Sequence, residues 1–176
     1  TDYRELLDKL GDKIDVVAVT GNSMGWYSTL ACGGALTAEG GFEVVNTMGT
    51  LMQAALIGGQ LVYPCVGEDW VPDAARKAAL MAKVAEIGAR PGHVFGLSID
   101  LGGMLVLAGN DAGLKALKAE VPPEQGRFPM RLSNHAAFHT ALQAPVAEQG
   151  RQRLSVRLFG QPELPMIDGR GAPAAS

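Results

Sequence analysis

The 176-residue sequence predicts an α/β fold: a hydrolase-like core of parallel strands with a nucleophile elbow, and an inserted ferredoxin-like (βαββαβ) subdomain. The first observation behind this prediction is the apolar, β-branched run Asp15–Thr20, which leads directly into the turn sequence Gly21–Gly25. The second is a pair of long uncharged runs, Val16–Ala38 and Val44–Gly67, which are typical of parallel strands covered by helices on both faces. The third is a change to shorter units after Gly58.

The core elements are predicted from hydrophobic periodicity and from residues that start or stop helices. A first helix over Tyr3–Leu10 has its apolar residues on one face and ends at Gly11. The other expected core elements are a strand over Asp15–Thr20, a helix over Trp26–Gly33, a helix over Ala38–Ala55 capped by Thr37, a helix over Leu142–Leu154 and a strand over Pro162–Ile167. We therefore assign residues 1–57 and 133–176 to the α/β core.

Residues 58–132 form the predicted inserted subdomain, because their elements follow the order β-α-β-β-α-β. The expected elements are a strand over Gln60–Val66, a helix over Pro72–Ile87 with Pro72 in its first turn, strands over Val94–Ile99 and Met104–Ala108, a helix over Asp111–Glu120 capped by Asn110, and a strand over Phe128–Leu132.

Composition excludes several classes of protein. The net charge of −3 gives no electrostatic reason to bind nucleic acid or an anionic membrane. Polar residues and Pro64 interrupt the uncharged runs, so we expect no membrane span, and the charged N-terminal segment is not a signal peptide. Cys32 and Cys65 are too few for a disulfide framework or a metal site. We expect two buried thiols in a reducing, cytoplasmic compartment, with no metal or cofactor.

The segment Gly21-Asn22-Ser23-Met24-Gly25 is the central chemical signal, because a G-x-S-x-G between a strand and a helix presents its serine on a sharp turn. The amide of Met24 then points to where an oxyanion forms, and the start of the helix adds partial positive charge there. The alternative is an ordinary Gly-Ser turn.

A serine nucleophile needs a base, and the sequence has three histidines. His93 follows Pro91-Gly92 and is interpreted as a solvated loop residue. His135 and His139 flank an apolar stretch, and the residues alone do not decide which of them faces Ser23.

Four segments resemble motifs of the malonyl-CoA:acyl-carrier-protein transacylase family, which includes the acyltransferase domains of fatty-acid and polyketide synthases. Gly21–Ser28 resembles its G-H-S-x-G-E-Y-S/T motif, and Gly49–Gln53 resembles the end of R-G-x-x-M-Q. Gly103–Gly109 resembles P-G-Q-V-V-I-A-G, and Phe138–Leu142 resembles F-H-S-x-x-M. The four occur in the family's order and cover nearly the whole chain.

The resemblance implies that Ser23 is the acyl-accepting nucleophile, that His139 is its base, and that His135 is a loop or supporting residue. The implied reaction is a ping-pong transfer from acyl-CoA to the phosphopantetheine thiol of an acyl carrier protein, with malonyl as the family's acyl group. Coenzyme A and phosphopantetheine are substrates, so no cofactor is implied.

The sequence departs from the family at several positions. Met48 stands where the family's arginine pairs with the malonyl carboxylate, which favours a neutral acyl group such as acetyl or a longer chain. Trp26 replaces a glutamate, and would either narrow the pocket or simply pack. A family asparagine is replaced near Asp100, and Arg131 is an alternative basic residue for substrate recognition.

The family's glycine- and glutamine-rich oxyanion loop, and the carbonyl that orients its histidine, have no counterpart here. We therefore expect a core that is incomplete at both ends. Two further interpretations stay open: a serine hydrolase or thioesterase with the same nucleophile and base, and a non-catalytic acyltransferase-like segment of a larger synthase.

Overall fold

The computed structural model describes residues 2–173, which form two compact units. Unit 1 comprises the described residues up to Thr50 and from Gly150 onward, and unit 2 comprises Leu51–Gln149. Each is described by itself. None of the helices within the described range is long and apolar enough to cross a lipid bilayer.

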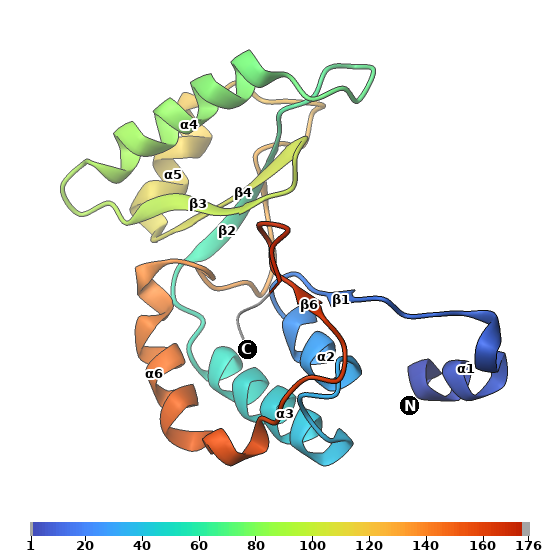
Figure 1. Ribbon diagram of the computed structural model, residues 1–176. Helices are drawn as coiled ribbons and strands as arrows, with labels where there is room; N and C mark the ends of the chain where they lie inside the picture. The colour runs from blue at the N-terminus through green and yellow to red at the C-terminus, as the bar shows by residue number, and fades with distance from the viewer. Residues whose placement is uncertain (1, 174–176) are drawn as a thin grey trace. The chain divides into compact units, whose positions relative to one another are not determined.

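Unit 1 is mainly helical and contains a two-stranded parallel sheet (Figure 1). Its elements are α1 (Asp2–Leu10), the 3-10 turn η1 (Gly11–Lys13), β1 (Val19–Thr20), α2 (Gly25–Cys32), most of α3 (Ala38–Ala54), the end of α6 (Ala144–Arg153), η3 (Val156–Leu158) and β6 (Met166–Ile167). Helix α2 contacts the sheet, while α1 lies apart at the end of an extended segment (Figure 1).

The sheet of unit 1 is shorter than the sequence predicts. Val19 pairs with Met166 and Thr20 with Ile167, in parallel. The predicted strands over Asp15–Thr20 and Pro162–Ile167 are therefore wrong in length, because hydrogen bonds between main chains form only where both segments run side by side. Val17, expected to be buried, is 74% exposed.

Helix α3 begins where the sequence predicts. The Thr37 hydroxyl accepts a hydrogen bond from the Gly40 amide at 3.0 Å, which satisfies one of the free amides of the first turn. Val44 of this helix is buried together with Ala35 and Leu36, which precede it. These three are the buried hydrophobic residues of the described part of unit 1.

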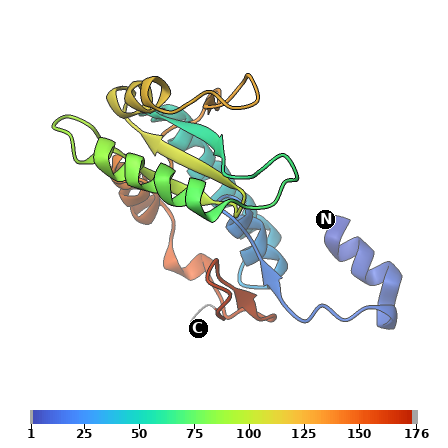
Figure 2. The same cartoon turned by 90° about the horizontal axis from the view of Figure 1, so that it is seen from above.

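Unit 2 is a four-stranded antiparallel sheet with α4 and α5 packed on one face (Figures 1 and 2). Its elements are β2 (Gly59–Pro64), α4 (Ala74–Gly88), β3 (Phe95–Asp100), β4 (Met104–Gly109), α5 (Asp111–Glu120), β5 (Met130–Arg131), η2 (Ala141–Gln143) and the start of α6. The strands lie in the order β3-β4-β2-β5. Between Gly59 and Arg131 the elements follow one another as β-α-β-β-α-β.

The core of unit 2 lies between this sheet and its two helices. Every residue of β2 is buried, and the sheet and both helices contribute fully buried side chains, such as Leu61, Ile87 and Leu114. The cluster is made by Leu61, Val62, Tyr63, Cys65, Leu80, Val84, Ile87, Leu105, Val106, Leu107, Leu114, Leu117 and Phe128.

The helix starts of unit 2 test the predicted caps. Asn110 caps α5 as predicted, since its side chain accepts from the Gly113 amide at 3.0 Å. The predicted start of α4 is wrong by two residues: Asp73 is the cap and accepts from the Arg76 amide at 2.9 Å, so Pro72 precedes the helix. An aspartate cap supplies an acceptor that a proline ring cannot.

Unit 2 extends beyond the predicted inserted subdomain, residues 58–132, and contains the segment around His139. Hydrogen bonds tie this segment to residues near β2: the Ala137 amide donates to the Ile57 carbonyl at 2.8 Å, and the Leu132 amide donates to the Gln60 carbonyl at 3.0 Å. Gly58, at φ +72°, allows the approach, because a Cβ there would lie 2.9 Å from the Ala137 Cβ.

Candidate functional site

Ser23 occupies a sharp turn between β1 and α2. Its backbone has φ +51°, a left-handed conformation that is uncommon for residues other than glycine. Two hydrogen bonds close the turn: the Gly25 amide donates to the Asn22 carbonyl at 2.8 Å, and the Trp26 amide to the Ser23 carbonyl at 3.1 Å. The local sequence thus holds a strained serine between a strand and a helix.

The two glycines that flank Ser23 differ in their surroundings. A Cβ on Gly21 would collide with the Thr29 hydroxyl and would lie 2.5 Å from the Gly25 carbonyl carbon. A Cβ on Gly25 would meet no described atom within 4 Å. Close packing of the backbone around the serine therefore requires glycine at the first position only.

Met24 begins the first turn of α2, and its side chain is 60% exposed. Main-chain amides at the start of a helix carry partial positive charge, so this end of α2 can stabilise negative charge that develops near Ser23. Trp26, two residues further, is half-buried.

A cavity of about 470 Å³ in unit 1 adjoins the turn at Gly21 and Gly25. Its walls come from the β1 segment and one face of α2, and they are mostly apolar. Ser23 does not line it. The lining residues are Val16, Ala18, Val19, Thr20, Gly21, Gly25, Ser28, Thr29 and Cys32. Cys32, predicted to be buried, is half-buried here, whereas Cys65 is fully buried in unit 2.

Met48 packs within unit 1 against Gly150 of α6. A Cβ on Gly150 would lie 2.6 Å from the Met48 sulfur and 3.1 Å from its methyl carbon, so the thioether rests directly on the glycine backbone. The side chain is half-buried and uncharged. Its position gives it a packing role, and its role in selecting an acyl group stays a prediction.

His139 lies in unit 2, whereas Ser23 lies in unit 1, so their pairing stays a prediction. His139 has φ +61°, again left-handed. A hydrogen bond joins the residues on either side of it: the Thr140 hydroxyl donates to the Ala137 carbonyl at 2.6 Å. The imidazole is exposed.

His135 is engaged with a residue that the sequence did not single out. One ring nitrogen, Nδ1, lies 2.8 Å from the Gln60 side-chain oxygen, and Gln60 in turn contacts Ser98 at 2.9 Å. Gln60 is only 3% exposed. The available signal was an amide at the start of an otherwise apolar strand run, because such a group needs partners when it is buried.

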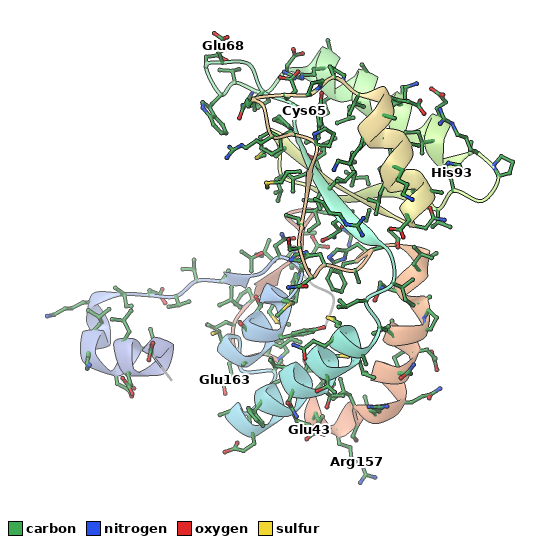
Figure 3. All side chains as sticks on the ribbon, turned by 180° about the vertical axis from the view of Figure 1, so that it is seen from behind. Glu43, Cys65, Glu68, His93, Arg157 and Glu163 are labelled. Atoms are coloured by element: carbon green, nitrogen blue, oxygen red, sulfur yellow. The ribbon has the colours of Figure 1, made fainter. Side chains whose placement is uncertain are left out.

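The remaining candidates have other partners in unit 2. Asp100 pairs with Lys77 at 2.5 Å, and this contact, with the Gly102 amide, lowers the pKa of the Asp100 carboxyl. Arg131 lies 3.5 Å from Asp111. His93 lies in the loop after α4, as predicted, with Nδ1 3.0 Å from the Pro91 carbonyl (Figure 3). Among residues 2–173, no three potential metal ligands gather as a cation site requires.

Comparisons with known proteins place this chain beside one group of enzymes. No family model matches it. A malonyl CoA-acyl carrier protein transacylase of Haemophilus influenzae is 29% identical over 132 residues, which cover 74% of this chain and 40% of that protein. The Escherichia coli K12 protein of the same name is 25% identical over 151 residues, covering 85% and 46%. The chain thus spans less than half the length of these curated relatives.

Solved structures agree on the fold. The malonyl-CoA:ACP transacylase of Synechocystis superposes with a TM-score of 0.77 at 21% identity, over 99% of this chain and 54% of that one. A malonyl-transacylase solved in complex with a type II polyketide acyl-carrier protein gives 0.74 at 20% identity, over 99% and 54%. The chain is therefore related in sequence and fold to the central portion of the malonyl-CoA:acyl-carrier-protein transacylases.

Proposed function

We propose that this protein is an acyltransferase that moves an acyl group from coenzyme A to the phosphopantetheine thiol of an acyl carrier protein through a Ser23 acyl-enzyme. The observation that carries the proposal is the left-handed backbone of Ser23 at the start of α2, in a chain whose curated relatives are transacylases. This turn is the proposed nucleophile elbow. We also propose that β2–β5 with α4 and α5 form the inserted ferredoxin-like subdomain.

The proposed chemistry uses the two residues in alternation. His139 takes the proton of the Ser23 hydroxyl, the serine oxygen attacks the thioester carbonyl, and coenzyme A leaves as a thiolate that the imidazolium protonates. The Met24 amide would stabilise the intermediate oxyanion. The carrier-protein thiol then attacks the serine ester by the same steps in reverse. The relative solved with an acyl-carrier protein supports this choice of partner.

Two observations point to different acyl groups as the substrate. The names of the curated relatives favour malonyl. Met48, at the position of the family's arginine, favours a neutral group, because a thioether cannot form the two charge-assisted hydrogen bonds that a guanidinium gives a carboxylate. We keep malonyl as the first substrate to test, and acetyl or a longer acyl chain as the second.

The test is covalent loading of the purified protein with radiolabelled malonyl-CoA and acetyl-CoA, followed by intact mass. We expect label on the wild type and on Ser155→Ala, and none on Ser23→Ala. Ser155 is the matched control because it is an exposed serine whose hydroxyl caps η3, at 3.2 Å from the Arg157 amide. No label from any acyl-CoA contradicts the proposal and favours a non-catalytic segment. Release of free acid without a carrier protein favours a thioesterase.

The same assay tests position 48. If Met48 selects against a carboxylate, Met48→Arg raises malonyl loading relative to acetyl loading by about 10-fold, the value of one charge-assisted contact. An unchanged ratio contradicts the proposed role of Met48.

A further inference from the structure

We propose that Gln60, Ser98 and His135 are positioning residues that fix the main chain at Phe138–His139 and thereby orient the His139 imidazole. The three side chains form one hydrogen-bonded chain, here called the Gln60 network, and it ends on the carbonyl of Phe138. The network lies wholly within unit 2. Its catalytic consequence rests on the proposed function, while its geometry does not.

The network is built around a buried amide. Gln60 is the second residue of β2, the strand between β4 and β5, and is 3% exposed. Its Nε2 lies 2.9 Å from the Ser98 hydroxyl, and its Oε1 lies 2.8 Å from His135 Nδ1. A buried amide that loses a partner costs about 1–3 kcal/mol, so both ends of Gln60 need these contacts.

A β-bulge provides the serine. Along β3, Leu97 pairs with Leu107 and Ile99 with Val106, so Ser98 is the extra residue between two consecutive partners on β4. A bulge redirects a side chain from the ordinary alternation of a strand. Ser98 can therefore contact both Gln60, two strands away, and the Phe138 carbonyl at 3.0 Å.

The donor and acceptor groups of the network allow only one assignment of donor and acceptor to each of its hydrogen bonds. A carbonyl oxygen only accepts, so the Ser98 hydroxyl must donate to Phe138. The Ser98 oxygen then accepts from the Gln60 amide nitrogen, which turns the Gln60 oxygen toward His135. Because that oxygen also only accepts, His135 must carry a proton on Nδ1. The network thus assigns the Nδ1–H tautomer to neutral His135.

The end of the network lies at the peptide that joins Phe138 to His139. Holding the Phe138 carbonyl fixes the plane of this peptide, and this plane sets the backbone of His139 at φ +61°. A left-handed histidine costs free energy and persists only where its surroundings over-determine it. The Ala137 amide on the Ile57 carbonyl, and the edge-on contact of the Phe138 and His135 rings at 5.9 Å, add to that constraint.

The first test needs no activity. In the full-length ¹⁵N-labelled protein, two-bond nitrogen–proton correlations report the tautomer of each histidine. We expect His135 as the Nδ1–H tautomer when neutral, and a mixture of tautomers in Gln60→Met, which keeps the side-chain length but removes both contacts. An Nε2–H tautomer for wild-type His135 overturns the proposal.

The second test separates positioning from substrate binding. In the loading assay, we expect Ser98→Ala and His135→Ala to slow Ser23 acylation about 10-fold while the KM for acyl-CoA stays within about twofold, because a displaced base affects the chemical step. His135→Asn should recover most of the rate, since its amide nitrogen can donate in place of Nδ1. His93→Ala is the matched control and should load as wild type. Wild-type rates in Ser98→Ala and His135→Ala overturn the positioning role.

A wild-type protein that does not load any acyl group would contradict the proposed function but would leave this inference testable. The readout is then the hydrogen exchange of the Ala137 amide, which donates to the Ile57 carbonyl at 2.8 Å and lies in the segment that the network holds. We expect exchange about 10-fold faster in Ser98→Ala than in wild type, because the carbonyl of Phe138 loses its donor. Equal exchange in the two proteins overturns the proposal.

Discussion

The two units of this protein use similar apolar sequences with different results. In unit 2, the run that forms β2 is buried at every residue, because β4 and β5 flank it and two helices cover the sheet. In unit 1, the run Asp15–Thr20 is a strand only at its last two residues and exposes Val17 at 74%. Apolar, β-branched composition therefore becomes buried strand only where neighbours pair with it and cover it.

The two units also differ in the structural features that they contain. Unit 2 contains the large continuous core and the Gln60 network, whereas unit 1 contains the strained Ser23 turn and few buried hydrophobic residues. Two-state unfolding is the expectation for a small single domain and not for a chain of two compact units, so each unit needs its own measurement. Amide hydrogen exchange resolves the two by residue.

The largest expected effect is in the core of unit 2. Leu61 is fully buried at the centre of the sheet, so Leu61→Ala should lower the stability of unit 2 by about 2–5 kcal/mol through lost burial and a cavity. The measurement is the exchange of β2 and β4 amides. The matched variant in unit 1 is Val17→Ala, which should change the β1 and α2 amides by less than about 0.5 kcal/mol. Equal losses would break the comparison between the units.

The next effect distinguishes two glycines within unit 1. Gly21→Ala should destabilise the β1–α2 turn by about 1–3 kcal/mol, because its Cβ has no room beside Thr29 and the Gly25 carbonyl. Gly25→Ala should be neutral or stabilise α2 by up to about 1 kcal/mol, because it reduces the freedom of the unfolded chain. Exchange of the α2 amides measures both, and a larger loss in Gly25→Ala would contradict the geometry of the turn.

The sequence predicted the features that depend on neighbouring residues. The caps Thr37 and Asn110 were identified correctly, because a capping side chain bonds to an amide three residues away. The order of elements in unit 2 followed from periodicity and turn residues. The length of β1 did not, because it depends on how far β6, some 147 residues later, runs beside it.

The candidate site likewise combines features that neighbouring residues determine with features that depend on distant residues. The left-handed turn at Ser23 is local, and the G-x-S-x-G pattern indicated it. The Gln60 network is not local: Gln60 contacts Ser98 and His135, which are 38 and 75 residues away, and it needs a bulge in β3. No pattern of neighbouring residues predicts those contacts. The sequence indicated them only through the Gln60 amide, a polar group in an otherwise apolar run.

The smallest expected effect concerns the surface of unit 2, where Arg90 donates to Glu120 from its two terminal guanidinium nitrogens, Nη1 and Nη2, at 2.5 and 2.7 Å. Arg90, far more than Lys83 at 3.4 Å, lowers the pKa of the Glu120 carboxyl to about 2. A carboxyl pKa lowered on folding stabilises the fold at pH values above its unfolded pKa. That contribution is lost as the pH falls from about 4.5 toward 2.

Carbon NMR of the Glu120 carboxyl measures this directly. We expect its midpoint near pH 2 in the wild type, a return to the ordinary glutamate range in Arg90→Met, and a smaller rise in Lys83→Met, the matched control. Because the pair is exposed, salt should weaken it, and neutral-pH exchange of the β2 amides should barely change in either variant. If Arg90→Met instead exposed those amides as much as Leu61→Ala does, the stability of unit 2 would depend on its surface charges rather than on its covered sheet. The contrast with unit 1 would then need a different cause.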